Sequence, residues 1–539
     1  MATTTSINLS SLDGSNGFRL DGRAPDQTGF SVSNAGDINS DGFDDVIVGS
    51  SGVYAYSSSN LSYVVFGKES DFSATVNLPD LDGKNGFRLD GVPDGFQDSI
   101  DHLVSGVGDI NGDGFDDFAI TESSFFDETY IANKSYVVFG KEAGFNAMMD
   151  LGSLDGDDGF SVLSNSIILS VKGAGDINGD GLDDLIVSDG QQNFDYMTYH
   201  EFSYIVFGKP TGFGASLDLS NLNGSNGFRL EKDTGYSRNE SVSTAGDVNG
   251  DGFDDFIAGG GGLDSYVVFG KASGFDASLH LSNLNGSDGF RLHSGEGVIS
   301  AISSAGDVNG DGFDDVIIGA HGADPNGRDS GSSYVVFGKA SGFEAAINLS
   351  DLSGVNGFRL DGVAADDESG HSVSGAGDVN GDGFDDVIIG AHGADPNGRD
   401  SGSSYVVFGK ASGFEAAINL SDLSGVNGFR LDGVAADDES GHSVSGAGDV
   451  NGDGFDDLIV GAPYTSSSYV IFGRSSFVDD VDFPGTPGDD IFTGTKAAES
   501  FEGGEGNDRM IGRGGADSFD GGTGNDYIRI LGDDFLLVD

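Results

Sequence analysis

The stretch Asp378-Val379-Asn380-Gly381-Asp382-Gly383-Phe384-Asp385-Asp386 occurs seven times in the chain with small changes. Its first, third, fifth and ninth residues carry side-chain oxygens, and glycine at the sixth position permits a sharp chain reversal. Six to eight oxygen ligands are what Ca2+ prefers. A plain Asx turn at a hairpin would not need the ninth aspartate in every copy. The stretch therefore predicts seven calcium-binding loops.

The predicted ligands in each loop are the side chains of positions one, three, five and nine, the backbone carbonyl of position seven, and water. The protein ligands are Asp37, Asn39, Asp41, Phe43, Asp45, Asp109, Asn111, Asp113, Phe115, Asp117, Asp176, Asn178, Asp180, Leu182, Asp184, Asp247, Asn249, Asp251, Phe253, Asp255, Asp307, Asn309, Asp311, Phe313, Asp315, Asp378, Asn380, Asp382, Phe384, Asp386, Asp449, Asn451, Asp453, Phe455 and Asp457.

Composition favours many short strands joined by tight turns. The 539 residues include 92 Gly, 40 Phe and only 9 Pro, and 37% of them are hydrophobic, which is enough to fill a core despite the acidity. The formal net charge of −64 excludes nucleic acid as an obvious partner. The acidic loops repel one another unless a divalent ion lies between them, so Ca2+ is predicted to be the cofactor and its removal to destabilise the protein.

The chain has no cysteine, no basic and apolar leader in residues 1–20, and no apolar run near 18 residues. These features predict a protein without disulfides or a membrane span, cytoplasmic unless another route exports it.

The loops recur every 60 to 72 residues, and each unit holds four strand signals. In the sixth unit these are residues 370–374, 386–390, 404–409 and 428–431, each rich in β-branched or aromatic residues and bounded by turn formers. Four antiparallel strands repeated seven times predict an all-β, seven-bladed β-propeller. A solenoid is the alternative architecture.

The two ends of the repeat region favour the closed ring. A lone fourth-strand signal lies at residues 17–20, whereas the seventh unit stops at its third strand, residues 468–473. Pairing the two would leave no free sheet edge, which a solenoid would keep at both ends. Residues 17–21 are therefore predicted to pair with residues 468–474.

The repeat unit resembles the FG-GAP repeat of the integrin α-subunit propeller and its bacterial relatives. The resemblance rests on Phe-Gly after the third strand, on Gly461-Ala462-Pro463 after the second, and on the acidic loop between the first two; it covers about residues 7–474. Six units depart from Gly-Ala-Pro, which makes the connecting loops individual. The resemblance implies Ca2+ loops on one rim and ligand recognition on the opposite face. It does not imply the integrin ligand.

From Gly485 the period becomes nine, in five segments covering residues 485–529, with Gly503-Gly504-Glu505-Gly506-Asn507-Asp508 as a full match to G-G-x-G-x-D. This resembles the RTX, or haemolysin-type, nonapeptide repeat, which forms a parallel β-roll that binds Ca2+ between turns. Residues 18 apart should then stack, with Glu499 on the edge opposite the Asp508 stack. A flexible Gly/Asp-rich tail is the alternative. The predicted ligands here are Asp490, Asp508, Asp517 and Asp526.

The predicted organisation is a propeller over residues 1–474, a linker over 475–484, a β-roll over 485–529 and a tail over 530–539. RTX proteins are typically exported in one step (type I secretion), and the acidic-then-apolar residues 533–539 resemble their C-terminal signal. The resemblance thus implies an extracellular or cell-surface protein, unfolded at low cytosolic Ca2+ and folded by Ca2+ outside.

No catalytic motif is recognisable, and the loop carboxylates repeat seven times whereas an enzyme needs one asymmetric site. The leading hypothesis is therefore a secreted or cell-surface calcium-binding adhesion or recognition scaffold, not an enzyme, with a protein or glycan ligand and possible self-association. The alternatives are an extracellular hydrolase or lyase, for which residues 194–202 are the one candidate region, and a structural surface-layer subunit.

Overall fold

The computed structural model describes residues 5–536, and it divides them into two compact units, residues 1–476 and 477–539. The positions left undescribed are 1–4, 24–25, 53–60, 92–98, 127–128, 143, 165–166, 194–197, 233–240, 260–261, 296, 478–482, 485–487, 489, 495–499, 504–505, 513–517, 522–523, 530–534 and 537–539.

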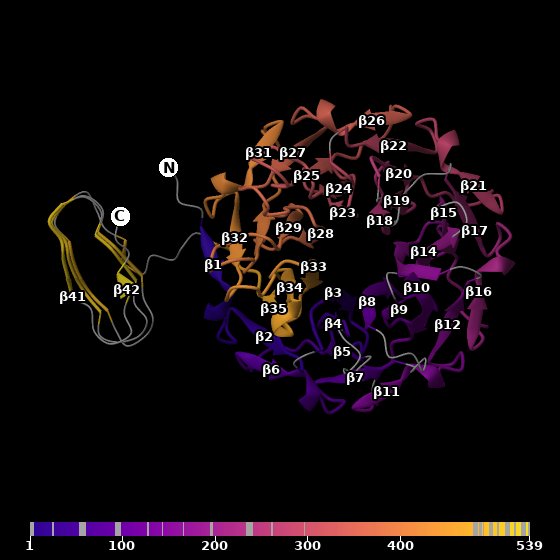
Figure 1. Ribbon diagram of the computed structural model, residues 1–539, viewed down its shortest axis with the longest axis horizontal. Coiled ribbons are helices and arrows are strands. Elements are labelled where there is room, and N and C mark those ends of the chain that lie inside the picture. The colour runs from indigo at the N-terminus through magenta and orange to yellow at the C-terminus, as the bar shows by residue number, and fades with distance from the viewer. Residues whose placement is uncertain are drawn as a thin grey trace. The chain divides into compact units, whose positions relative to one another are not determined.

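The first unit is a ring of seven five-stranded sheets, or blades, around a central axis (Figure 1). From the axis outward, blade 1 holds β3 (Ser31–Gly36), β4 (Asp45–Gly49), β5 (Leu61–Val65), β7 (Gly86–Asp90) and β11 (Met148–Asp150); blade 2 holds β8 (Ser99–Gly108), β9 (Asp117–Phe126), β10 (Thr129–Val138), β12 (Gly159–Leu163) and β16 (Ser216–Asp218); blade 3 holds β13 (Ile167–Gly175), β14 (Asp184–Asn193), β15 (Thr198–Val206), β17 (Gly227–Glu231) and β21 (Ser278–His280).

Blade 4 holds β18 (Ser241–Gly246), β19 (Asp255–Gly259), β20 (Asp264–Val268), β22 (Gly289–His293) and β26 (Ala346–Asn348); blade 5 holds β23 (Ala301–Gly306), β24 (Asp315–Ala320), β25 (Ser332–Val336), β27 (Gly357–Asp361) and β31 (Ala417–Asn419); blade 6 holds β28 (Ser372–Gly377), β29 (Asp386–Ala391), β30 (Ser403–Val407), β32 (Gly428–Asp432) and β1 (Ser6–Asn8); blade 7 holds β33 (Ser443–Gly448), β34 (Asp457–Ala462), β35 (Ser467–Ile471), β2 (Gly17–Asp21) and β6 (Thr75–Asn77).

The ring closes as the sequence predicts. β2 pairs antiparallel with β35, from Gly17 opposite Ile471 to Asp21 opposite Ser467. The all-β, seven-bladed prediction is therefore confirmed, and the open solenoid is wrong. Closure places Phe18 at the interface between blades 7 and 1, where its side chain is fully buried.

The outermost strand of each blade is a feature that the strand signals did not predict. After its third strand, each unit steps across to the neighbouring blade, adds a three-residue parallel strand there, makes a 3-10 turn, and returns as its own fourth strand. β31, for example, pairs with β27, with Ala417 opposite Arg359. The 3-10 turns are Leu9–Ser11, Leu78–Asp80, Leu151–Ser153, Leu219–Asn221, Leu281–Asn283, Leu349–Asp351 and Leu420–Asp422; an eighth, Pro463–Thr465, follows β34.

The segment that crosses to the neighbouring blade also packs against that blade through aromatic stacking. Phe414, which precedes β31, stacks on Phe358 of β27 with ring centroids 4.6 Å apart, and the Lys410 Nζ lies 4.8 Å from the Phe414 ring centroid. Stacked rings and cation–π contacts add to the burial of apolar area. Equivalent stacked pairs, among them Phe87 with Phe145 and Phe290 with Phe343, lie at five other interfaces between blades.

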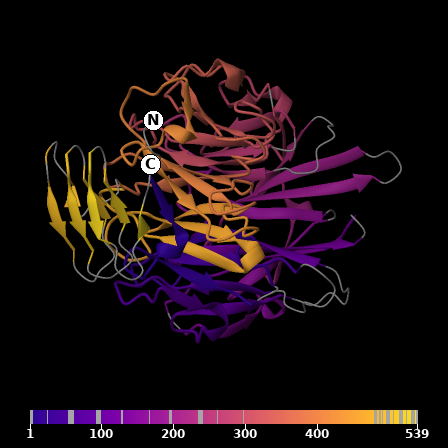
Figure 2. The ribbon, with the colours of Figure 1, turned by 60° about the vertical axis from the view of Figure 1, so that its left-hand side comes forward.

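The second unit, described by itself, is a short parallel β-roll (Figure 2). One sheet holds β37 (Ile491–Thr493), β39 (Arg509–Ile511) and β41 (Tyr527–Arg529); the other holds β36 (Phe483–Pro484), β38 (Ser500–Glu502), β40 (Ser518–Asp520) and β42 (Phe535–Leu536). Ile491 lies opposite Arg509, and Arg509 opposite Tyr527, so the predicted 18-residue stacking is confirmed.

Candidate calcium sites

Each acidic loop joins the first and second strands of a blade, so all seven lie on one rim of the ring, here called the acidic rim. In the sixth loop, the Asp378 carboxylate accepts hydrogen bonds from the backbone N–H groups of Asp382 at 3.0 Å and Gly383 at 2.8 Å. Gly383 has φ +89°, and an added Cβ would meet nothing within 4 Å. Glycine is therefore needed there for the backbone conformation and not for space.

The ninth-position aspartate is the buried end of the loop. In Asp386, Oδ1 accepts from the Gly409 N–H at 2.9 Å and Oδ2 from the Val379 N–H at 3.1 Å. The side chain is fully buried, and burial, followed by the charges of Asp382 and Asp378, raises its pKa to about 8. The other ninth-position aspartates are equally buried, with pKa values raised to about 8 or 9: Asp45, Asp117, Asp184, Asp255, Asp315 and Asp457.

A divalent cation fits this chemistry. In the third loop, the charges of Asp180 and Asp176 add to burial in raising the pKa of Asp184, and the Asn178 side-chain amide donates to the Asp184 carboxylate at 3.2 Å. Oxygen-rich, negatively charged groups in partly buried surroundings need a counter-ion. Among the described residues, no three His, Cys, Asp or Glu side chains are already arranged as a metal cage. The first-position carboxylates are instead held by backbone N–H groups, so these residues remain candidate ligands.

The eighth-position aspartate has a role that the sequence analysis missed. Asp385 reaches out of its own loop, and its Oδ2 accepts a 2.7 Å hydrogen bond from the backbone N–H of Asp307 in the preceding loop. The same bond, at 2.7–2.9 Å, joins each loop to the next around the closed ring. The signal was present, since all seven loops have Asp at position eight and Gly just before position one.

In the β-roll, three of the four predicted ligands lie on one edge. The Asp490 N–H donates to Asp508 Oδ1 at 2.8 Å, and the Asp508 N–H donates to Asp526 Oδ1 at 2.9 Å. Asp508 is buried. Asp517 and Glu499 lie outside the described residues.

The opposite rim carries the connections between second and third strands, and these differ among blades. In blades 2 and 3, strands β8, β9, β10 and β14 are ten residues long, whereas β3, β4 and β5 of blade 1 have five or six; the violet and magenta strands reach beyond the rest of the ring (Figure 2). The catalytic candidate region 194–202 begins outside the described residues, at 194–197.

Four histidines gather on this opposite rim. The His371 ring lies 4.3 Å from that of His392, 5.2 Å from His442 and 5.7 Å from His321, measured between centroids. Their Nδ1 atoms are buried without a hydrogen-bond partner. The sequence pattern does not predict this cluster, because the four residues come from three different blades.

None of the helices in the described part of the chain is long and apolar enough to cross a membrane. What the geometry defines is a seven-bladed β-propeller with a ring of acidic loops, followed by a parallel β-roll.

Comparison with known families agrees with this class. The FG-GAP repeat matches residues 28–65, 104–138, 300–336, 369–407 and 440–482, and the RTX calcium-binding nonapeptide repeat matches residues 493–528. The chain thus carries FG-GAP repeats in its propeller and RTX calcium-binding repeats in its β-roll, and the RTX match implies that Ca2+ is its cofactor.

Similar curated proteins are integrin α-subunits. The chain is 33% identical over 246 residues to integrin alpha pat-2 of Caenorhabditis briggsae and 32% identical over 253 residues to integrin alpha pat-2 of Caenorhabditis elegans, in each case over 18% of the relative. It is 28% identical over 224 residues to integrin alpha-V of Gallus gallus, over 19% of that protein. These alignments cover 43%, 44% and 40% of the present chain, which spans under a fifth of each relative's length. FG-GAP and RTX repeats together indicate an extracellular or surface calcium-binding protein, and neither is in general an enzymatic module.

Proposed function

We propose that the protein is an extracellular adhesion or recognition scaffold that binds a protein or glycan ligand at the opposite rim and requires Ca2+ in its seven acidic loops, Asp37–Asp45 being the first. The observation that carries this proposal is the asymmetry between rims: the acidic loops are nearly identical in all seven blades, whereas the connections on the other rim vary in length and sequence, with only those of blades 5 and 6 alike. Variable loops on a rigid scaffold are where recognition concentrates.

Two connections on the opposite rim are each held by an ion pair and a backbone hydrogen bond. In blade 5, the Arg328 guanidinium pairs with the Asp366 carboxylate, and the Asp366 N–H donates to the Arg328 carbonyl at 2.8 Å. Blade 6 repeats the arrangement with Arg399 and Asp437. In blade 7, Tyr464 is 57% exposed on the same rim. Arginine and tyrosine are enriched where proteins bind partners.

The test is an array of glycans and matrix proteins probed with the full chain in Ca2+ and again with chelator. We expect binding that requires Ca2+ and is weakened by Tyr464→Ala or Arg399→Ala. The matched control is Val355→Ala, because Val355 is 86% exposed but lies in a connection to a fourth strand, on the acidic rim. Equal loss in Val355→Ala, or binding indifferent to chelator, would contradict the proposal.

We propose also that export follows the one-step route, with the acidic chain unfolded at low cytosolic Ca2+. Residues 533–534 and 537–539 of the proposed signal lie outside the described residues. Deleting residues 530–539 should abolish secretion while leaving the Ca2+-induced folding of the purified protein unchanged. Secretion that persists without these residues would contradict this part of the proposal.

A further inference from the structure

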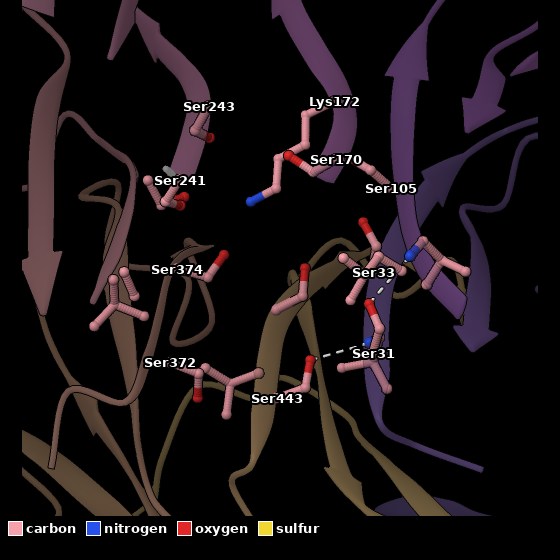
Figure 3. Close-up of a pocket in the computed structure, with 18 of the residues that line it drawn as sticks. Ser31, Ser33, Ser105, Ser170, Lys172, Ser241, Ser243, Ser372, Ser374 and Ser443 are labelled. Atoms are coloured by element: carbon pink, nitrogen blue, oxygen red, sulfur yellow. Dashed lines mark hydrogen bonds between the residues drawn. The ribbon is translucent and has the colours of Figure 1, made fainter. Parts of the chain in front are cut away.

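The ring encloses a cavity on its axis, with a volume of about 600 Å3. Its lining comes from the innermost strand of every blade, β3, β8, β13, β18, β23, β28 and β33 (Figure 3). Cavities of roughly 300–1,000 Å3 are the usual size of small-molecule sites. Neither the acidic loops nor the proposed ligand surface on the opposite rim uses this space.

One position in the innermost strands breaks the sevenfold pattern. Three residues before the glycine that precedes each acidic loop, six blades carry serine and blade 3 carries lysine. All seven side chains line the cavity: Ser33, Ser105, Lys172, Ser243, Ser303, Ser374 and Ser445. Lys172 is the one Lys or Arg in these seven strands. A single unrepeated charge in a ring of hydroxyl groups gives the cavity an asymmetric centre.

Lys172 has no ionic partner in the part of the chain that the structure describes. Its amino group points into the open centre of the cavity (Figure 3), and no hydrogen bond or ion pair joins it to another described residue. Burial lowers its pKa, because the ammonium has lost part of its hydration. The chain has 89 acidic residues, yet Asp101 is the one carboxylate among the described residues that line this cavity.

The acidic group in the lining does not neutralise Lys172. The Asp101 carboxylate accepts a 2.5 Å hydrogen bond from Ser51 Oγ. Asp101 precedes Ser105 by four residues on β8, and Ser105 occupies the level of Lys172, so the backbone positions of Asp101 and Lys172 are about 13 Å apart along the strand direction. Lys172 therefore faces hydroxyl groups.

Those hydroxyl groups include free donors. The hydroxyl group of Ser243, on the strand β18 beside Lys172, has no hydrogen-bond partner among the described residues. The hydroxyl groups of Ser303 and Ser445 also lack one there. Ser105, on the other neighbouring strand β8, donates to the Gly106 carbonyl at 2.8 Å. An ammonium flanked by free hydroxyl donors can donate several hydrogen bonds to the oxygens of an anion.

We propose that the axial cavity binds a small oxyanion, a carboxylate, phosphate or sulfate group, with Lys172 as its counter-ion and the serine hydroxyls around it as hydrogen-bond donors. None of the acidic-loop aspartates is among the described residues that line the cavity.

The test uses the full chain saturated with Ca2+, with sulfate and D-glucuronate as probes and chloride at equal ionic strength as the reference. Calorimetric titration should show saturable binding to the wild type. Lys172→Ser restores the serine of the other six blades and should weaken both probes roughly tenfold or more, since a charge-assisted hydrogen bond is lost. Lys84→Ser is the matched control, because Lys84 is 87% exposed, and it should bind as the wild type does.

A second measurement uses the wild-type protein, so that the proposal can be tested even if Lys172→Ser does not fold. Acylation of Lys172 in the wild-type protein, followed by mass spectrometry, should slow down with increasing sulfate, whereas acylation of Lys84 should not. Equal binding by wild type and Lys172→Ser, no binding above the chloride reference, or acylation of Lys172 that ignores sulfate would each overturn the proposal.

Discussion

Replacing Gly306 by alanine isolates the contact that links neighbouring acidic loops. Gly306 has φ +69°, and a Cβ there would collide with the carboxylate of Asp385 from the next loop, the group that accepts from the Asp307 N–H. Gly312, six residues on, has φ +87° with nothing within 4 Å of an added Cβ. Both substitutions carry the same backbone cost, but only Gly306→Ala displaces the aspartate.

The two variants should lose different amounts of unfolding free energy. A left-handed conformation costs a non-glycine residue about 1–2 kcal/mol. A hydrogen bond to a charged group contributes about 1.5–3 kcal/mol. Gly312→Ala should therefore lower the free energy of unfolding by about 1–2 kcal/mol, and Gly306→Ala by about 2.5–5 kcal/mol.

The assay is urea denaturation in saturating Ca2+, completed as a double-mutant cycle with Asp385→Ala. Once the carboxylate is gone, Gly306→Ala should cost no more than Gly312→Ala. The reasoning is refuted if Gly306→Ala costs the same in both backgrounds, because the aspartate would then play no part in holding the blades together.

Three further outcomes follow from the fold. Chelating Ca2+ should lower the melting temperature in calorimetry, because the seven ninth-position carboxylates, Asp386 among them, are buried beside other carboxylates and would lose their counter-ion; an unchanged melting temperature would count against the loops as metal sites. Acid should destabilise the opposite rim. Burial, together with the charges of neighbouring histidines, lowers the pKa of His371 from 6.5 to about 3 and that of His392 from 6.5 to about 4. The Glu368 carboxylate lies 3.6 Å from His392. The folded state then binds fewer protons than the unfolded one, so stability is complete above pH 6.5 and falls toward pH 4 by about 1.4 kcal/mol per pH unit for each such histidine; urea midpoints between pH 7 and 5 should drop less in His392→Gln, and an equal drop would contradict this. Phe18→Ala should cost about 3–5 kcal/mol, because the ring is fully buried where the strand β2 closes the propeller; a loss below about 1 kcal/mol in urea denaturation would show that closure there is dispensable.

The sequence by itself determined the features that repeat. Seven copies of one acidic loop and of four strand signals predict seven blades, since each unit obeys local rules of turn and strand chemistry. The missing fourth strand of the last unit even predicts how the ring closes. The 18-residue stacking of the β-roll follows for the same reason, because it depends on period alone.

The tertiary structure decided what happens between units. A sequence pattern shows that Asp385 stands at position eight, but only the ring places it against the backbone of the preceding loop. Likewise, the outer strand β31 leaves its own blade for the neighbour, and His371 of blade 6 meets His442 of blade 7. Lys172 is an unremarked lysine in the sequence, and it becomes a lone charge in a serine-lined cavity only when seven first strands surround one axis. Local signals specify the blades, whereas the contacts between residues about seventy positions apart arise from packing, and no local pattern encodes that geometry.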